Sequence, residues 1–235
     1  MKNLLKEYFE ENKFNCREEQ LNQFVKYYEM LLEYNKVMNL TAITEKHDVF
    51  SKHFIDSVQV MKFFDFNEKK IIDLGTGAGF PGIPLAILNP NSKFTLVDSL
   101  RKRLDFIDTV CETIGLKNVT TNHSRFEDLA RKDEYRNNFD YGVSRAVAPL
   151  NILLEYSIPF IKINGKFISY KSIEGKNELN SSINAQKILR CKLDSIYEYE
   201  IPENDSTRNL IVFEVMDRTP NKYPRKAGIP KKKAL

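Results

Sequence analysis

The sequence predicts an α/β fold built on a mostly parallel seven-stranded sheet, with a helical extension before the sheet and an antiparallel strand at its end. Between about residues 68 and 172, apolar strand-like segments alternate with helical segments, an order typical of parallel βαβ units. Residues 1 to about 65 instead carry apolar side chains at helical spacing. After residue 172, a polar helical segment precedes two segments of alternating apolar and polar residues, which predict a closing antiparallel hairpin.

The N-terminal part contains two apolar helical faces. The first consists of Leu21, Phe24, Val25, Tyr28, Leu31 and Leu32, and the second of Val49, Phe50, Phe54, Val58, Met61 and Phe64. The segment 34–43 between them is too polar for a core element. We therefore expect a helical cap over residues 1–66, a core over 67–217 and a basic tail over 218–235.

The alternating pattern places the elements of the core. Strands are predicted at 70–74, 93–97, 118–122, 139–144, 166–171, 197–201 and 209–215. Helices are predicted at 82–88, 99–114, 124–132, 148–161 and, as a polar helix, near 176–190. Gly115 is a natural stop for the helix that begins at residue 99.

Composition indicates an ordinary enzyme-sized chain rather than a membrane or disulfide-rich protein. Its 235 residues suffice for one large domain or one domain with an extension, and 42% are apolar. Three widely spaced cysteines argue against a disulfide framework and for a reducing compartment. No apolar segment reaches the length of a membrane span, and the charged N-terminus lacks a signal-peptide core. We expect a cytoplasmic monomer with no membrane association.

The first predicted strand ends in a glycine-rich loop. Gly75, Gly77 and Gly79 follow the segment 71–74 at alternate positions. Glycine accepts the positive φ angles of sharp turns and lets a ligand approach the backbone. A strand, such a loop and a following helix form a nucleotide-type pocket at the carboxyl edge of a parallel sheet.

Two ligands fit this loop. Residues 77–82 match the dinucleotide pattern G-x-G-x-x-G, but Asp73 makes the loop also match the acid-first pattern of S-adenosylmethionine (SAM) methyltransferases. The acid can pair with the cationic amino-acid part of SAM, whereas it would repel a pyrophosphate. Asp73 therefore favours SAM over NAD. Three alternating glycines destabilise the folded loop, and a turn that binds no ligand would gain nothing in return.

A second acid, Asp98, ends the next predicted strand. It lies near the offset at which an acid meets ribose hydroxyls in this architecture. The alternative is that Asp98 only caps the following helix, although Ser99 could be that cap and leave Asp98 free. Both NAD and SAM carry ribose, so Asp98 does not separate them.

Missing motifs narrow the chemistry. No cysteine lies at the end of the fourth or sixth strand, as methylation of pyrimidine C5 requires. Residues 144–149 stand where methylation of the adenine amine usually uses an Asn/Asp-Pro-Pro-aromatic turn. Arg145 in that segment suits guanine or a phosphate, and an ion pair with an acid at the sheet edge explains it equally well. Guanine N7 has a free lone pair, so transfer there needs no general base.

Histidines and the C-terminal tail leave open alternatives. The spacing of His47, His53 and His123 matches no common zinc site, and we expect no metal. His53 lies in an apolar helix, which is more typical of a core or edge histidine than of a ligand.

From residue 218 onward there are seven Lys or Arg residues and no acid, so the tail either binds a phosphate backbone or is simply solvated. The mixture of residues in 223–230 favours a docked segment.

Taken together, the motifs resemble the RsmG/GidB family (glucose-inhibited division protein B) of bacterial 16S ribosomal RNA guanine-N7 methyltransferases. The resemblance covers nearly the whole chain, and Gly79-Phe80-Pro81-Gly82-Ile83-Pro84 is its most specific part. The matching segments are Asn35, 39–43, 73–86, 96–103, 124–127, 144–146, 218–220 and 223–230.

The resemblance implies a Rossmann-like SAM-methyltransferase fold and transfer of methyl to N7 of the guanine usually numbered 527. Its partner would be 16S ribosomal RNA or the small ribosomal subunit. The cofactor-binding residues expected from the pattern and the resemblance are Asp73, Gly75, Gly77, Gly79, Phe80, Asp98, Ser99, Phe126, Glu127 and Arg145. The expected RNA contacts are Arg101, Lys102, Arg103, Arg218, Arg225 and Lys226, with Arg145 a candidate for orienting substrate or cofactor.

Some of these residues also have an ordinary structural explanation. Phe126 and Glu127 also fit an ordinary helix start, and residues 101–103 also fit the solvated face of a helix. Two rival functions are an NAD-dependent oxidoreductase, which Asp73 disfavours, and a non-catalytic RNA-binding or assembly protein. The intact loop with both Asp73 and Asp98 argues against the second rival.

Overall fold

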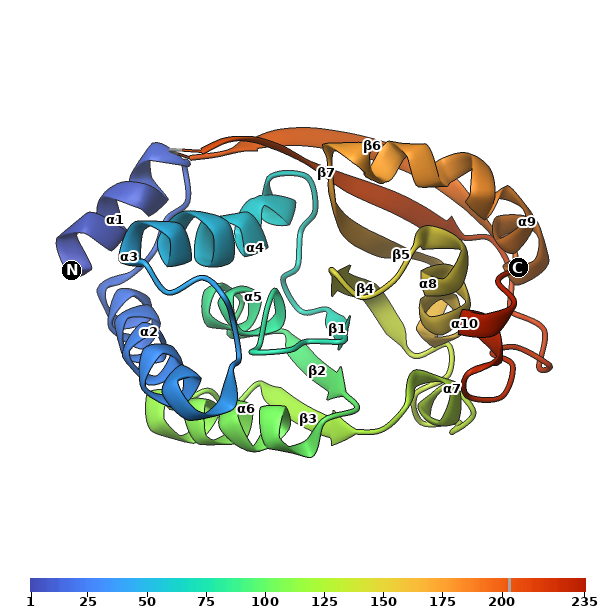
Figure 1. Ribbon diagram of the computed structural model, residues 1–235, viewed down its shortest axis with the longest axis horizontal. Helices are drawn as coiled ribbons and strands as arrows, with labels where there is room; N and C mark the ends of the chain where they lie inside the picture. The colour runs from blue at the N-terminus through green and yellow to red at the C-terminus, as the bar shows by residue number, and fades with distance from the viewer. Residues whose placement is uncertain (203) are drawn as a thin grey trace.

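The computed structural model describes residues 1–202 and 204–235 and contains a seven-stranded sheet (Figure 1). Its strands are β1 (Lys70–Leu74), β2 (Lys93–Asp98), β3 (Val119–His123), β4 (Phe139–Arg145), β5 (Ile161–Ser172), β6 (Cys191–Ile201) and β7 (Asn204–Val215). They lie in the order β3-β2-β1-β4-β5-β7-β6. The first five strands are parallel, and β7 is antiparallel to both β5 and β6. The predicted fold class is confirmed.

Helices cover both faces of the sheet (Figure 1). Those of the N-terminal extension are α1 (Lys2–Glu11), α2 (Glu18–Met38), α3 (Lys46–Asp48), the π-helix η1 (Val49–Ile55), α4 (Asp56–Val58) and the 3₁₀ turn η2 (Gln59–Lys62). Those of the core and tail are α5 (Gly82–Leu88), α6 (Arg101–Ile114), α7 (Phe126–Leu129), α8 (Leu150–Ser157), η3 (Ile158–Phe160), η4 (Ile173–Glu178), α9 (Leu179–Leu189) and α10 (Ile229–Lys232).

Several boundaries differ from the sequence expectation. The helix α2 runs to Met38, into the polar segment 34–43, and ends at Asn39 in the left-handed region. The helix predicted over 148–161 ends at Ser157 because Pro159 cannot continue it, and β5 already begins at Ile161. The helix predicted over 124–132 is reduced to the four residues of α7. Strand β6 begins at Cys191, earlier than predicted, because it pairs along β7.

Buried apolar side chains form one cluster on each face of the sheet. The first joins the N-terminal helices to α5, α6 and the sheet. Within it, the Phe54 ring lies 5.0 Å from Phe24 and 6.1 Å from Phe80, the aromatic residue of the glycine loop. The second cluster holds α8 and α9 and includes Tyr223 of the tail. The extension and the tail are therefore packed on the core from opposite sides (Figure 1).

In the part of the chain that the structure describes, no helix combines the length and apolar character needed to cross a bilayer.

Candidate active site

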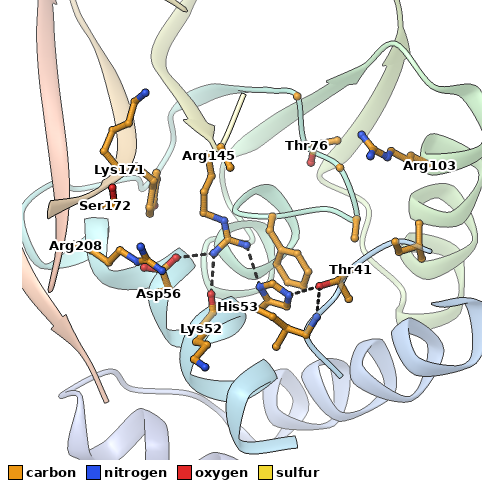
Figure 2. Close-up of a pocket in the computed structure, with 18 of the residues that line it drawn as sticks. Thr41, Lys52, His53, Asp56, Thr76, Arg103, Arg145, Lys171, Ser172 and Arg208 are labelled. Carbon is orange, nitrogen blue, oxygen red and sulfur yellow. Dashed lines mark hydrogen bonds and ion pairs between the residues drawn. The ribbon is translucent and has the colours of Figure 1, made fainter. Parts of the chain in front are cut away.

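A pocket of about 570 Å³ lies at the carboxyl ends of β1 and β4. The glycine loop forms one wall, and the π-helix η1, the end of β5 and strand β7 contribute charged side chains to the rest (Figure 2). The lining includes Thr41, Lys52, His53, Asp56, Gly75, Gly77, Phe80, Arg103, Arg145, Lys171, Ser172 and Arg208. Its volume is typical of small-molecule and cofactor sites.

The loop has the backbone that its glycines predict. Gly75 has a φ of +78° and Gly77 a φ of +62°. A Cβ atom on Gly75 would lie 2.4 Å from Cγ2 of Val147, so this position is closed to any side chain. A Cβ on Gly77 would meet nothing within 4 Å, and Gly77 lines the pocket. Gly77 is thus the point at which the backbone of the loop is open to a ligand.

Asp73 lies beneath the loop rather than on the surface of the pocket. Its side chain is fully buried, and Oδ2 accepts a hydrogen bond of 3.0 Å from the backbone N–H of Gly82. Oδ1 has no hydrogen-bond partner among the described residues. Burial raises the pKa of Asp73 to about 7, although the nearby Thr76 side chain and, to a smaller extent, the hydrogen bond from Gly82 oppose the shift. The carboxyl group therefore fixes the loop and changes its protonation near neutral pH.

Asp98 joins the loop to α6. Oδ2 accepts from the backbone N–H of Gly77 at 3.1 Å and pairs with Nη1 of Arg103 at 3.3 Å. Oδ1 accepts from the N–H of Leu100 at 2.9 Å, which starts the turn before α6 and explains why the helix begins at Arg101. Asp98 is therefore not the N-cap of α6, because that position is Leu100 and no side chain caps the helix; its carboxylate stabilises the turn that precedes the cap. Ser99 is exposed, and its carbonyl accepts from Nε2 of His123 at 3.0 Å.

Arg145 is held by residues of the N-terminal extension (Figure 2). Its Nη1 donates to Oδ2 of Asp56 at 2.6 Å and to the carbonyl of Lys52 at 3.0 Å. Oδ1 of Asp56 accepts from the Tyr199 hydroxyl at 2.6 Å. The guanidinium carbon also lies 5.2 Å from the centre of the Phe80 ring, within reach of a cation–π interaction. The ion-pair interpretation of Arg145 is observed, but its acid belongs to α4 and not to the sheet edge.

His53 is a neutral pocket residue. Its ring stacks on Phe80 with centroids 4.4 Å apart, and burial followed by the charge of Arg145 lowers the pKa of His53 to about 3. Because arginine can only donate, the contact of 3.3 Å with Nη2 of Arg145 makes Nδ1 an acceptor. Nε2 then carries the proton and donates to Oγ1 of Thr41 at 2.9 Å. Both ring nitrogens are occupied.

Phe126 and Glu127 lie next to the loop but outside this pocket. Cζ of Phe126 is 3.6 Å from the Cβ position built on Gly75, so the ring borders the loop. Glu127 is buried, and its Oε1 accepts from the backbone N–H of Gly228 at 3.2 Å. The Phe126 ring thus borders the loop outside the pocket, and Glu127 is directed toward the tail.

The predicted RNA-binding residues fall into two groups. Arg101, Lys102, Arg218 and Lys226 are exposed. Arg103 pairs with Asp98 and lines the pocket, whereas Arg225 forms a two-pronged ion pair with the fully buried Glu155. The guanidinium of Arg225 is therefore engaged inside the protein.

Sequence reasoning missed several cations and polar groups of the pocket. Lys52 and Asp56 follow from the π-helical turn, which shifts the register of the helix and has no local sequence signal. Lys171 at the end of β5 pairs with Glu178 at 2.8 Å. Arg208 of β7 reaches the pocket with no acidic side chain within ion-pair distance among the described residues. The adjacency of Tyr170 and Lys171 was visible in the sequence, but not that their strand ends at the pocket.

Within residues 1–202 and 204–235, no cluster of His, Cys, Asp and Glu has the arrangement needed to hold a metal ion.

Known proteins match this chain over most of its length. The family model "GidB: rRNA small subunit methyltransferase G" matches residues 20–211. The Ribosomal RNA small subunit methyltransferase G of Clostridium tetani is 45% identical over 228 residues, which cover 97% of this chain and 92% of the relative. The protein of the same name from Alkaliphilus metalliredigens is 43% identical over 235 residues, covering 100% and 98%.

Solved structures share the fold at low sequence identity. TYW2 from M. jannaschii in complex with AdoMet has a TM-score of 0.52 at 16% identity and covers 69% of this chain and 76% of its own. TYW2 from P. horikoshii in complex with MeSAdo has a TM-score of 0.55 at 10% identity, covering 70% and 62%. At these identities the comparison supports the architecture alone.

Proposed function

Because the chain belongs to the GidB family of rRNA small subunit methyltransferase G proteins, we propose that it transfers a methyl group from SAM to N7 of one guanine in 16S ribosomal RNA. The guanine is the one usually numbered 527. The observation that carries the proposal is that the glycine loop and the Arg145 cluster line the same pocket. A cofactor on the loop and a base beside Arg145 would then lie next to each other.

The loop side of the pocket suits SAM. SAM supplies an electrophilic methyl group on a positively charged sulfur. The open backbone at Gly77 admits the ligand, and Asp98 fixes that backbone through the Gly77 N–H. The buried carboxyl group of Asp73 can balance the cationic sulfonium and ammonium groups of SAM when it is ionised, and the Phe126 ring borders the loop on the side of Gly75. These features favour SAM over a pyrophosphate-bearing dinucleotide.

The side of the pocket around Arg145, where the guanine would bind, is called the acceptor side. Its described residues offer no free general base. Both oxygens of Asp56 accept hydrogen bonds, and Nδ1 of His53 accepts from Arg145. Burial raises the pKa of Tyr170 and of Tyr199 well above 10, so both remain neutral hydroxyls. Such a pocket fits guanine N7, which already has a lone pair and loses no proton. Catalysis then depends on alignment and on exclusion of water.

Rigid placement is what this chain contributes to that alignment. Arg145 is fixed by Asp56, by the Lys52 carbonyl and by the Phe80 ring, so its charge does not reorganise during transfer. Arg145 therefore orients the substrate or the cofactor and takes no part in proton transfer.

The remaining cations suit an RNA backbone. Lys52, Lys171 and Arg208 line the acceptor side, and a target base that leaves its stack would bring its phosphate to them. The exposed Arg101, Lys102, Arg218 and Lys226 complete the proposed contact, while Arg225 holds the tail. We propose that the protein acts as a monomer in the cytoplasm on ribosomal RNA or on the small subunit.

The test is methyl transfer from radiolabelled SAM to total ribosomal RNA and small subunits from cells that lack the protein. Borohydride–aniline cleavage reports N7-methylguanine, and primer extension then assigns the label to one position. The Gly77→Arg variant is the control, because its side chain would fill the open point of the loop. No label on any RNA form while SAM still binds would contradict the proposal and favour a non-catalytic RNA-binding protein.

The dinucleotide alternative is tested separately. Titration with NADH and with SAM should show binding of SAM only. Tight binding of NADH would instead support the alternative that residues 77–82 bind a dinucleotide.

A further inference from the structure

The C-terminal segment Tyr223–Pro230, which we call the strap, is fastened to the core by two buried acids. Glu155 of α8 accepts from the backbone N–H of Arg225 at 2.8 Å and from Nε and Nη2 of the same residue at 2.9 and 2.5 Å. Glu127 of α7 accepts from the backbone N–H of Gly228. Figure 1 shows the end of the chain lying against α7 and α8. The strap is therefore a docked part of the fold.

Two arginines fasten the strap from the same region of the core. Nη2 of Arg131 donates to the carbonyl of Pro224 at 2.5 Å, and Nη1 of Arg136 donates to the carbonyl of Tyr223 at 3.0 Å. The Tyr223 side chain is buried in the apolar cluster that contains α8. The first half of the strap is thus held by the two arginines, by the apolar contacts of Tyr223 and by Glu155, and its second half is held by Glu127.

Each of the two acids is the sequence neighbour of an aromatic residue, of which one borders the glycine loop and the other packs on the first. Phe126 precedes Glu127, and Tyr156 follows Glu155. The two rings are 5.5 Å apart, and Phe126 reaches the Cβ position of Gly75. We call Phe126 and Tyr156 the aromatic pair. The same two helices therefore contact the strap through their acids, while the Phe126 ring of α7 borders the loop and the Tyr156 ring of α8 packs against Phe126.

Helix α7 depends on such external support. It consists of only four residues, and a single helical turn is not stable alone in water. Its second residue, Glu127, is the one bonded to the strap. Helix α8 carries a fully buried carboxylate at Glu155, which needs the Arg225 guanidinium to remain in place.

We propose that the strap is a positioning element of the cofactor site, which holds α7 and α8 so that the aromatic pair forms a wall for the adenine of SAM. This rests on the proposed function, because it assumes that SAM occupies the loop. Arg225 is accordingly a positioning residue that acts through Glu155 and Tyr156, and it does not contact the cofactor. The outer cations Lys226 and Lys231–Lys233 are exposed and serve no part of this wall.

The test measures SAM affinity in the absence of RNA, by calorimetry on the full chain well below each variant's melting temperature. Arg225→Met keeps an unbranched apolar stem and removes the fork, and we expect SAM binding about 10-fold weaker. Arg225→Lys keeps one charged donor and should recover part of that loss. The matched control is the triple variant Lys231→Ala, Lys232→Ala and Lys233→Ala, which should bind SAM within about twofold of the parent protein.

Hydrogen–deuterium exchange of the protein without ligand gives a second readout. Peptides covering 126–130 should exchange faster in Arg225→Met than in the parent protein, whereas those of β1 and β2 should not change. If Arg225→Met does not fold, the double variant Glu155→Gln with Arg225→Met removes both charges and leaves no buried ion unpaired. SAM affinity and α7 exchange are then measured on that protein.

Unchanged SAM affinity together with unchanged α7 exchange in a folded variant would overturn the inference and leave the strap a purely structural feature. Faster exchange without any loss of affinity would overturn it as well, because the aromatic pair would then not bear on the cofactor. Failure of the parent protein to bind SAM would instead overturn the proposed function.

Discussion

Replacing Asp73 by asparagine should stabilise the ligand-free protein at pH 8 and leave its stability almost unchanged near pH 4. Asp73 is fully buried, and burial raises its pKa from the ordinary 3.8 to about 7. The folded protein therefore binds this proton more tightly than the unfolded chain does. The resulting stabilisation is complete below about pH 4 and is lost as the pH rises through about 7.

The magnitude follows from the difference of about 3 pKa units, which corresponds to about 4 kcal/mol of unfolding free energy. Asparagine is neutral at every pH, has nearly the same shape, and can still accept the hydrogen bond from Gly82. The free energy of unfolding of Asp73→Asn relative to the parent protein should therefore be near zero at pH 4. It should increase to about +4 kcal/mol at pH 8.

Urea unfolding of both proteins at several pH values between 4 and 8 measures this difference. Asp105→Asn on the exposed face of α6 is the matched control, and its effect should stay within about 0.5 kcal/mol at every pH. A difference that does not change with pH, or an Asp73→Asn protein that is less stable at pH 8, would refute the reasoning. The first result would mean that folding does not shift the pKa of Asp73, and the second that the fold stabilises the ionised carboxylate.

The same substitution should weaken SAM binding, although it stabilises the protein. A buried carboxylate beneath the loop attracts the sulfonium and ammonium groups of SAM, and asparagine does not. Binding of SAM to the parent protein near pH 7 should also release a fraction of a proton, because the bound cation lowers the pKa of Asp73. Calorimetry in two buffers with different ionisation enthalpies measures that release. If no proton is released on binding, the charge of Asp73 does not interact with the cofactor.

Three further substitutions test the pocket. Gly75→Ala should weaken SAM binding about 100-fold or more, because the new Cβ would lie 2.4 Å from Val147 and the residue would have to keep a φ of +78°. Near-normal affinity would show that the loop can rearrange to accept the side chain. Tyr27→Phe removes the 2.6 Å hydrogen bond from the buried hydroxyl to the carbonyl of Ala78 and should cost about 1–3 kcal/mol of unfolding free energy in urea titrations. Arg208→Ala should weaken binding of 16S RNA and reduce its salt dependence by about one ion, with SAM affinity unchanged. A loss of SAM affinity would instead place Arg208 on the cofactor side.

The fold was predictable because its signals are local. Glycines at alternate positions after a short apolar strand, and the regular alternation of strand and helix, are each readable within about a dozen residues. The glycine loop adopted the positive φ angles expected of it. Errors fell at element ends, where a single proline at 159 or the side chain of Asp98 decides between one more helical turn and none.

The partners of the site residues were not predictable, because they are set by tertiary contacts. Arg145 pairs with Asp56, 89 residues away, and Arg225 pairs with Glu155, 70 residues away. A basic residue in a charged tail looks the same in sequence whether it faces RNA or a buried acid. Only the acid, Glu155, carried a weak signal, since it is an ionisable residue among the apolar positions of α8.

The boundary near residue 66 divides two sequence patterns, and the contacts across it argue that the two parts depend on each other. The Tyr27 hydroxyl of α2 donates a hydrogen bond to the loop carbonyl of Ala78, and both the His53 ring and the Arg145 guanidinium lie against the Phe80 ring. Without the extension, Arg145 would lose Asp56 and remain a partly buried charge with no counter-ion. The loop would also lose the apolar surface that covers Phe80. We infer that the N-terminal helices complete the cofactor site, so that the extension and the sheet form one cooperative unit of folding and of function.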